Sequence, residues 1–332
     1  MSLKQSILQI LEENRETSIS GQQLAKRFSV SRAAVWKAIN ALKTEGYQID
    51  SVTNKGYRLA EDCDILSAEG ILPFLKLEYK DTDLYVSKTV ESTNQEAKKY
   101  SAKKTKQRIL IVANEQTLGK GRFGRTFFSP ENSGIYMSII LPLNIEAINA
   151  VLITTAAAVA VCRAIQSVAN VQPQIKWVND IFLEGKKICG ILTEAFTNVE
   201  SGIVESVVVG IGVNFKTKPE QFPDEIKETA ASLFSGKAPS VTRNHLIAEM
   251  TNQLLEICGD LNDRQFLEEY KARSMVLGEK IQFFRNNSWH IAKVLDIDPN
   301  GGLIIEDEQG KIQTLNSGEI SIQWIKTEEK ER

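Results

Sequence analysis

Apolar residues recur every three or four positions through the first 45 residues of the chain, and this periodicity predicts three amphipathic helices. The first helix is expected over residues 3–14. Ser20 and Gln23 form a capping-box pattern at the start of the second helix, and Ser31 begins the third, which ends at Gly46. Only residues 28–30 separate the second helix from the third, and so short a turn predicts a helix-turn-helix.

A short hairpin is predicted after the third helix, over residues 47–52 and 56–59, and it corresponds to the wing of a winged helix. The outward face of the third helix and the turn of the wing carry side chains suited to a major groove and its phosphates. The predicted DNA-binding residues are Arg32, Lys37, Asn40, Lys43 and Lys55. Small helix-turn-helix domains also dock other proteins. Trp36 is expected to pack against the wing rather than contact a base.

The middle of the chain alternates strand-like and helical segments after a connection over residues 61–75. Strands are predicted at residues 83–90, 108–115, 134–141, 174–177, 187–196 and 207–215. A helix follows the first strand as far as Tyr100. An alanine-rich helix over residues 151–168 must be buried on most sides, and two more helices are expected over residues 241–259 and 263–271. Short strands at residues 279–284, 289–296, 301–307 and 312–316 then fit a small SH3-like barrel.

The predicted fold class is therefore α+β with three domains: an N-terminal winged helix-turn-helix over residues 1–62, a central mixed β-sheet with helices over 63–271, and a C-terminal SH3-like β-barrel over 272–332. A chain of 332 residues, 42% hydrophobic and 25% charged, is long enough for these cores. The net charge is -2, but residues 1–60 hold nine Lys and Arg against five Asp and Glu. This local excess of +4 supports the DNA-binding prediction.

The composition excludes several classes of protein. The longest apolar stretch, residues 147–165, is interrupted by Asn149, Thr154, Thr155 and Arg163, so no membrane span and no membrane partner are predicted. The first residues lead into a helix pattern rather than a signal peptide, and a cytoplasmic protein is expected. Four scattered cysteines and two histidines argue against a disulfide framework, a His/Cys metal site or a histidine-based triad. Catalysis would then depend on carboxylates, cations and backbone groups.

Glycines alternate with cations in the loop Gly119-Lys120-Gly121-Arg122-Phe123-Gly124-Arg125. Glycine lets a ligand approach the backbone closely and the cations supply positive charge, so the loop suits a phosphate or a carboxylate. Its spacing matches G-x-G-x-x-G, but residues 125–134 are rich in aromatic and turn residues and begin no helix, which excludes a dinucleotide-binding fingerprint. The H-R-D and D-F-G segments of a protein kinase are missing as well.

Further polar residues stand at the ends of predicted strands. Asn179 and Asp180 end one strand, Lys187 begins the next, and Asn214 closes a third. Turn formation is the commoner role for a residue such as Asp180, and helix capping is the commoner role for the Ser-Thr-Asn run at residues 92–94. Lys187 is harder to explain in structural terms, because it heads the apolar run 188–192.

In combination, six motifs resemble the bifunctional biotin protein ligases that are also biotin-operon repressors. In order they are Glu91-Ser92-Thr93-Asn94, the loop Gly119–Arg125, Lys176-Trp177-Val178-Asn179-Asp180, Lys187-Ile188-Cys189-Gly190-Ile191-Leu192, Gly210-Ile211-Gly212-Val213-Asn214 and Gly318-Glu319-Ile320-Ser321. The resemblance covers nearly the full chain and implies a class II synthetase-like central sheet. It implies that biotin and MgATP give biotinyl-5′-AMP and pyrophosphate, and that the adenylate then acylates a lysine of a biotin carboxyl carrier domain.

The resemblance also implies the site residues. Biotin would be bound by Ser92, Thr93, Asn94, Gln116, Lys120, Gly121, Arg122 and Lys187. ATP would be bound by Arg122, Arg125, Phe127, Asn179, Asp180 and Asn214. Arg122 and Lys187 would stabilise the charge that develops when the biotin carboxylate attacks the α-phosphorus. Asp180, the third expected catalytic residue, would either hold Mg²⁺ or deprotonate the acceptor lysine.

The chain departs from the family pattern at three positions: Lys120 replaces an arginine, Phe127 a tryptophan and Val178 a proline. Lysine is a point charge and phenylalanine a smaller stacking face, so altered affinity is expected. As corepressor, the adenylate would favour a homodimer that binds an inverted repeat in operator DNA.

Two alternatives remain, a ligand-responsive transcription regulator without ligase activity and a lipoate ligase. The presence of Arg122 and Lys187 disfavours the first. The winged helix and the loop over residues 120–125 disfavour the second.

Overall fold

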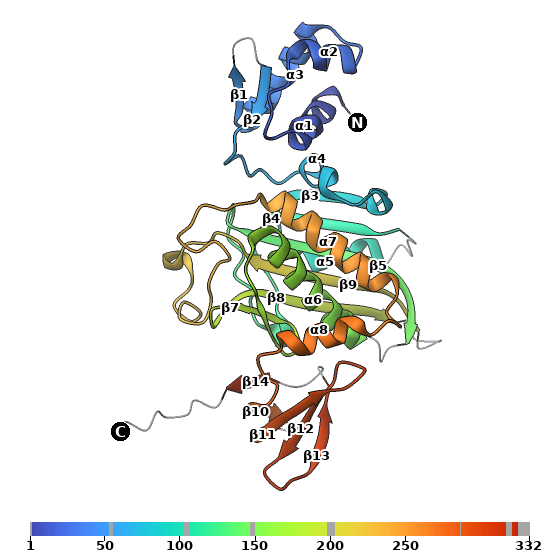
Figure 1. Cartoon of the computed structure of the whole chain (residues 1–332), viewed down its shortest axis with the longest axis vertical. Coiled ribbons are helices and arrows are strands. Elements are labelled where there is room, and N and C mark those ends of the chain that lie inside the picture. Colours follow the sequence, from blue (N-terminus) through green and yellow to red (C-terminus); the bar gives the residue numbers. More distant parts are fainter. Residues whose placement is uncertain are drawn as a thin grey trace.

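The computed structural model describes residues 2–52, 56–101, 107–146, 150–197, 203–285, 287–316 and 321–324. Three bodies follow one another along the long axis of the molecule: a small helical body that contains the N-terminus, a central sheet with helices, and a body of antiparallel strands near the C-terminus (Figure 1). The α+β fold class predicted from the sequence is confirmed.

The N-terminal body is a winged helix. It contains α1 (Leu3–Glu13), α2 (Gly21–Arg27), α3 (Arg32–Thr44) and the antiparallel hairpin of β1 (Ile49–Val52) with β2 (Gly56–Leu59). Ser20 and Gln23 form the predicted capping box, and the Ser31 side chain accepts a hydrogen bond from the Ala34 N–H. A separate core of apolar residues holds these elements together; its fully buried members include Ile7, Leu11, Leu24, Val35, Ile39, Leu42 and Leu59.

The prediction that Trp36 packs against the wing is wrong, since its side chain is 60% exposed. The inward stripe of α3 consists of Val35, Ala38, Ile39 and Leu42. Position 36 is turned about 100° from position 35 around the helix, and that rotation carries its indole out of the core. The predicted DNA contacts Arg32, Lys37 and Lys43 are exposed and Asn40 is half-buried, whereas Lys55 lies outside the described residues.

The connection to the central body contains short helical turns at α4 (Ala68–Ile71), η1 (Leu72–Phe74) and η2 (Leu77–Tyr79). Beyond it lies a mixed sheet in the order β3-β4-β5-β9-β8-β7-β6. Its strands are β3 (Asp83–Val90), β4 (Ile109–Gln116), β5 (Gly134–Glu146), β6 (Gln174–Lys176), β7 (Asp180–Leu183), β8 (Lys186–Thr197) and β9 (Ile203–Asn214). The β3–β4 pair is parallel and the other neighbouring strands are antiparallel.

Helices cover both faces of this sheet. The helices α6 (Ala150–Ala169), α7 (Arg243–Gly259) and α8 (Gln265–Arg273) lie together on one face, as Figure 1 shows. Alternate residues of β4 divide between the two faces: Leu110 and Val112 join the core under α6, while Ile109 and Ile111 pack with Ala97 of α5 (Thr93–Ser101). Both faces of the central strands are therefore buried, which explains their continuous apolar sequences.

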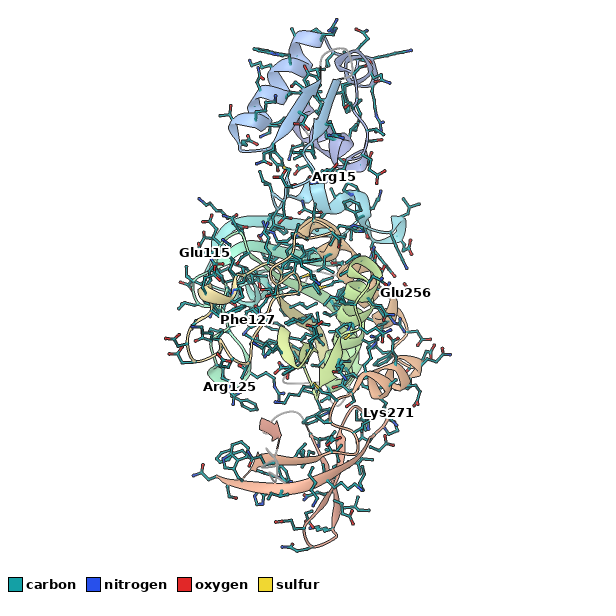
Figure 2. All side chains as sticks on the ribbon, turned by 60° about the vertical axis from the view of Figure 1, so that its left-hand side comes forward. Arg15, Glu115, Arg125, Phe127, Glu256 and Lys271 are labelled. Carbon is teal, nitrogen blue, oxygen red and sulfur yellow. The ribbon has the colours of Figure 1, made fainter. Side chains whose placement is uncertain are left out.

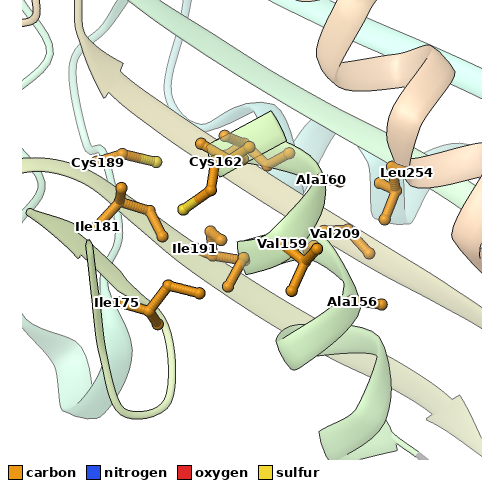
Figure 3. Packing of buried hydrophobic residues seen from close by; sticks show 14 of the residues in the cluster. Ala156, Val159, Ala160, Cys162, Ile175, Ile181, Cys189, Ile191, Val209 and Leu254 are labelled. Carbon is orange, nitrogen blue, oxygen red and sulfur yellow. The ribbon is translucent and has the colours of Figure 1, made fainter. Parts of the chain in front are cut away.

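The apolar helix α6 forms the centre of the main core. Figure 3 shows Ala156, Val159 and Ala160 close to Ile191 and Val209 of the sheet. The stretch Val151–Ala169 is long and apolar enough to cross a membrane, but 72% of its most apolar 18-residue segment is buried inside the protein. Burial of this kind is typical of a core helix, as the sequence predicted.

One strand was not foreseen in the central body. Asp180 begins β7 instead of closing the preceding strand, and β7 pairs with both β6 and β8. Asn179 and Asp180, at the start of this segment, are turn-forming residues, so the sequence favours a connection there instead of a strand.

The C-terminal strands form an antiparallel sheet in the order β13-β12-β11-β10-β14, as expected for an SH3-like barrel. They are β10 (Lys280–Arg285), β11 (Ser288–Ile297), β12 (Leu303–Asp307), β13 (Ile312–Leu315) and the unpredicted β14 (Ser321–Trp324). Their apolar residues join the main core, and the indole N–H of Trp177 donates to the Gly301 carbonyl at 2.9 Å. Residues 318–320 of the last sequence motif lie outside the described residues.

Candidate functional site

A cavity opens where the ends of several strands of the central sheet meet the glycine-rich loop. It contains about 940 Å³ of space that no atom fills, part of it continuous with solvent. The motifs predicted from the sequence come together around it. Its lining includes Ser92, Thr93, Asn94, Gln116, Lys120, Gly121, Arg122, Arg125, Phe127, Asn179, Asp180 and Lys187.

A network of hydrogen bonds fixes the polar residues at the inner end of the cavity. Gln116 Oε1, at the end of β4, accepts from the Thr93 N–H at 2.8 Å and from Thr93 Oγ1 at 3.1 Å. The hydroxyl of Ser138 lies 2.7 Å from Thr93 Oγ1 and 2.6 Å from Asn94 Oδ1. Each of these side chains is held by another, so the start of α5 presents a rigid set of donors and acceptors to a ligand.

Asn94 is also held by the neighbouring strand β8. Its Nδ2 donates to Glu194 Oε2 at 2.8 Å and to the Leu192 carbonyl at 3.2 Å. Lys98 completes this group through an ion pair with Glu194, at 2.7 Å. Ser138 and Glu194 were not predicted as site residues. The sequence offers a signal only for Ser138, which interrupts the apolar run over residues 135–141, whereas Glu194 directly follows another polar residue, Thr193.

The loop Gly119–Arg125 folds back on itself at the mouth of the cavity. The Gly121 N–H donates to the Arg125 carbonyl at 2.7 Å, and the Phe127 N–H donates to the Gly119 carbonyl at 2.9 Å. Phe123, at the tip, has a positive φ of 56° and a side chain that is 55% exposed. Phe123 and the three cations of the loop, Lys120, Arg122 and Arg125, all contribute to the lining of the cavity.

Arg122 connects this loop to the opposite wall of the cavity. One guanidinium nitrogen, Nη1, donates to Asn179 Oδ1 at 3.2 Å, and the centre of the guanidinium lies 4.9 Å from the Phe123 ring centroid, as in a cation–π contact. Burial lowers the pKa of Arg122, and the nearby Asp180 carboxylate partly offsets this shift. The partly desolvated cation is ready to bind an anion that enters the cavity.

A second group of charges lies on β6, β7 and β8. Lys187 Nζ is 2.7 Å from Asp180 Oδ1, and both side chains are partly exposed. This contact is an ion pair whose angles do not fit a hydrogen bond, and Asp180 Oδ1 accepts no hydrogen bond from the described residues. Burial lowers the pKa of Lys176, which also lines the cavity and was not predicted as a site residue. Among the described residues there is no group of three or more metal-ligating side chains.

Phe127 rests on glycines of the two central strands. A Cβ added to Gly212 would lie 2.5 Å from the Phe127 ring, and one added to Gly190 would lie 3.3 Å from it. A Cβ added to Gly210 would instead lie 2.2 Å from Asn94 Oδ1. The glycines of the Gly210–Asn214 motif thus make room for two different parts of the site. Figure 2 shows Phe127 and Arg125 on the same side of the central body.

Asn214 lies apart from these residues. Its side chain is 7% exposed, is absent from the described lining of the cavity, and donates from Nδ2 to the Ala231 carbonyl at 3.1 Å. The structure thus gives Asn214 a contact that anchors the segment after β9, in place of direct access to the cavity.

Three parts of the chain match known families. Residues 4–58 match an HTH domain, residues 86–214 match the biotin/lipoate A/B protein ligase family, and residues 291–322 match the biotin protein ligase C-terminal domain. The bifunctional ligase/repressor BirA of Bacillus subtilis (strain 168) is 32% identical over 329 residues, which cover 97% of this chain and 99% of that protein. The chain belongs to the BirA family of bifunctional ligase/repressors.

More distant members of the BirA family agree with this assignment. BirA of Escherichia coli (strain K12) is 25% identical over 306 residues, covering 91% of this chain and 92% of that protein. Among solved structures, the biotin protein ligase from Aquifex aeolicus in complex with biotin and ATP aligns with a TM-score of 0.62 at 25% identity, covering 73% of this chain and 99% of that one. The family resemblance read from the sequence motifs is confirmed.

Proposed function

We propose that this protein is an ATP-dependent biotin protein ligase and a biotin-dependent transcriptional repressor that acts in the cytoplasm. The observation that carries the proposal is the joining of two kinds of surface in one cavity. Thr93, Asn94 and Gln116 form a fixed polar pocket, and Arg122, Lys176 and Lys187 surround the space next to it with positive charge. Such a cavity suits a ligand with a neutral hydrogen-bonding head and an anionic end that meets a nucleotide.

In the first step, a biotin carboxylate oxygen would attack the α-phosphorus of ATP, form biotinyl-5′-AMP and release pyrophosphate. Two anions must approach each other, and negative charge accumulates on the phosphoryl oxygens. Arg122 and Lys187 would offset that charge, with Lys120, Arg125 and Lys176 in support. Removing one well-placed donor from a site of this type lowers the rate by about 10²–10³.

Phe127 would stack on the adenine, and Asn179 would hold the nucleotide next to Arg122. Asp180 suits magnesium, because Mg²⁺ in nucleotide sites is usually held by one or two carboxylates together with phosphate oxygens. Asp180 lines the cavity, where its carboxylate is paired with Lys187 at 2.7 Å. When bound, the metal would neutralise phosphate charge.

In the second step, the uncharged amine of a carrier lysine would attack the biotinyl carbonyl carbon, form an amide and release AMP. The acceptor would be a biotin carboxyl carrier domain, whose lysine must reach the mouth of the cavity near Asp180 and the loop Gly119–Arg125. Asp180 is also the carboxylate best placed to accept a proton from that amine.

For repression, the adenylate would act as corepressor and favour a homodimer whose two winged helices bind an inverted repeat of operator DNA. The exposed basic residues Arg32, Lys37 and Lys43 support the DNA contact. Biotin with MgATP, but not with MgADP, should strengthen operator binding, because only the first pair produces the adenylate.

The decisive experiment incubates the protein with MgATP, an apo carrier domain and either biotin or lipoate, and measures the mass of the carrier. Biotin should be attached to a single lysine while lipoate is not. Attachment of lipoate alone would identify a lipoate ligase. A carrier that stays unmodified, together with biotin-dependent DNA binding, would identify a regulator that has lost ligase activity.

A further inference from the structure

A buried arginine of α7 holds the segment that connects the winged helix to the central sheet. The Arg243 side chain is only 2% exposed. Its Nε donates to Asp64 Oδ2 at 2.8 Å and its Nη2 donates to the Asp64 carbonyl at 2.7 Å. The Arg243 backbone N–H donates to the other carboxylate oxygen, Asp64 Oδ1, at 2.8 Å. Asp64 is therefore held at three points by a single residue.

Two more buried polar residues of α7 bind the same connection. The Asn244 side chain accepts from the Ser67 N–H at 3.2 Å and donates to the Ile65 carbonyl at 2.8 Å. Asn252 accepts from the Lys76 N–H at 3.0 Å and donates to the Phe74 carbonyl at 2.9 Å. These amides satisfy backbone groups that would otherwise face water, so residues 64–76 follow α7 closely.

The same arginine also contacts the strands that carry the site. Arg243 Nη1 donates to Asn114 Oδ1 on β4 at 2.9 Å and to the carbonyl of Gly134, the first residue of β5, at 3.2 Å. Just beyond the end of β9, Lys216 Nζ lies 2.8 Å from Asp64 Oδ2. We call Asp64, Lys216 and Arg243 the linker clamp.

The segments that the linker clamp contacts or belongs to lie only a few residues from the cavity. Asn114 is two positions before Gln116, and Lys216 is four positions after Gly212; Gln116 and Gly212 both line the cavity. At ~3.3 Å per residue these separations are roughly 7–13 Å. A shift of the strand ends on ligand binding would therefore reach the clamp through rigid backbone.

Toward the N-terminus, the linker clamp follows directly after the winged helix, with no linker residues in between. Cys63, the residue before Asp64, belongs to the buried core of the winged helix. Its carbonyl accepts from Arg15 Nη2 at 2.9 Å, and Arg15 Nε is paired with the buried Glu12 of α1 at 2.6 Å. Figure 2 shows Arg15 at the junction between the winged helix and the central body.

We propose that the linker clamp is the joint that sets the position of the winged helix according to what the cavity holds, with Asp64 and Lys216 as positioning residues for ligand-dependent DNA binding. The inference rests on the proposed function. Order imposed by a ligand on the ends of β4, β5 and β9 moves Asn114, Gly134 and Lys216 together. All three are tied to Asp64, directly or through Arg243, so the connection and α1 follow.

Lys216 is the member to change, because its side chain is 33% exposed and its removal leaves Asp64 paired with Arg243. Removing Asp64 or Arg243 would instead leave a buried charge without a partner and would endanger the fold. Lys216→Met keeps most of the side-chain stem and loses the charge. Lys216→Arg should restore the pair. Lys227→Met is the matched control, because it breaks a more exposed ion pair, with Asp224, away from the connection.

Hydrogen exchange of the full-length protein, with and without biotin plus MgATP, provides the test. In the wild type, exchange should slow in peptides from residues 90–127 at the cavity and in peptides from residues 61–76. In Lys216→Met the cavity peptides should remain protected while the response of residues 61–76 is lost. Lys216→Arg and Lys227→Met should behave as the wild type does. The gain in operator affinity caused by the ligands should fall at least ~fivefold in Lys216→Met, with the biotinylation rate unchanged.

Protection of the cavity peptides with no response from residues 61–76 in the wild type would refute the clamp and leave the proposed function standing. An unaltered response in Lys216→Met would refute it too. Loss of biotinylation in that variant would show that Lys216 supports the site itself, and would also overturn the inference. If the ligands protected no peptide of the wild type, both the proposed function and the clamp would be wrong.

Discussion

Gly210 and Gly212 lie two positions apart on β9, and the same substitution should affect a different substrate at each. A Cβ on Gly212 would meet three atoms of the Phe127 ring at 2.5, 2.7 and 3.0 Å, whereas carbon atoms in contact normally lie 3.5–4.0 Å apart. The ring must therefore withdraw by about 1 Å. A Cβ on Gly210 would lie 2.2 Å from Asn94 Oδ1 and would displace that amide from the polar pocket.

A displacement of about 1 Å in a site can cost 10²-fold in activity. We therefore expect Gly212→Ala to raise the KM for ATP by about 10–100-fold, which corresponds to ~1.4–2.8 kcal/mol, with little change in the KM for biotin. Gly210→Ala should instead raise the KM for biotin, with little change in the KM for ATP. Gly190→Ala is the matched control for the ring, because its Cβ would lie 3.3 Å from Phe127 and a small adjustment would accommodate it.

The assay is pyrophosphate release, with one substrate varied while the other is saturating. Thermal unfolding of each variant should be measured in parallel, since overpacking costs about 1–3 kcal/mol of stability and must be separated from the effect on binding. A rise in the KM for biotin caused by Gly212→Ala, with the KM for ATP unchanged, would refute the placement of adenine at Phe127.

Three further outcomes are expected. Lys187→Met should slow adenylate formation by about 10²–10³, and a wild-type rate of pyrophosphate release would contradict its assignment. Burial lowers the pKa of His245 below its ordinary value of 6.5, so the unfolded chain binds the proton more readily than the folded protein does. The free energy of unfolding, measured with urea, should therefore fall as the pH decreases below about 6.5. The fall should be smaller in His245→Phe, which preserves stacking on Phe74. Lys37→Ala should weaken operator binding and reduce its salt slope by about 1.8, since each protomer of the dimer loses one phosphate contact worth about 0.9, without changing biotinylation; an unchanged slope would place Lys37 away from phosphate.

The sequence predicted most elements because their local signals agree with the tertiary fold. Ser20 with Gln23 and the apolar stripe of α3 are both read from neighbouring positions, and the structure confirms both. The prediction for Trp36 was wrong because large aromatic side chains are usually buried, and this general tendency was given more weight than the helical periodicity. The periodicity places position 36 outside the buried face of α3. β7 was missed because it begins at Asp180, directly after Asn179, and this pair of turn-forming residues favours a connection.

For the site, the sequence supplied the chemistry but not all of the contacts. Glycines, cations and amides in short motifs predicted a binding site for an anion, and twelve of the predicted site residues line the cavity. Asn214 belongs to one of those motifs, yet its side chain faces Ala231, because the direction of a side chain at a strand end depends on the segment that packs beside it. Ser138 and Glu194 entered the site only when β5 and β8 were brought next to α5.

The sequence by itself determined the fold class and the family, since periodicity, capping and motif spacing are properties of nearby residues, and it predicted which residues line the cavity. The tertiary structure alone revealed what joins the parts. Asp64 and Arg243 are separated by 179 positions in the chain, and neither stands in a motif. Their contact exists because folding brings α7 against the connection, where a buried guanidinium needs a carboxylate and several carbonyl partners.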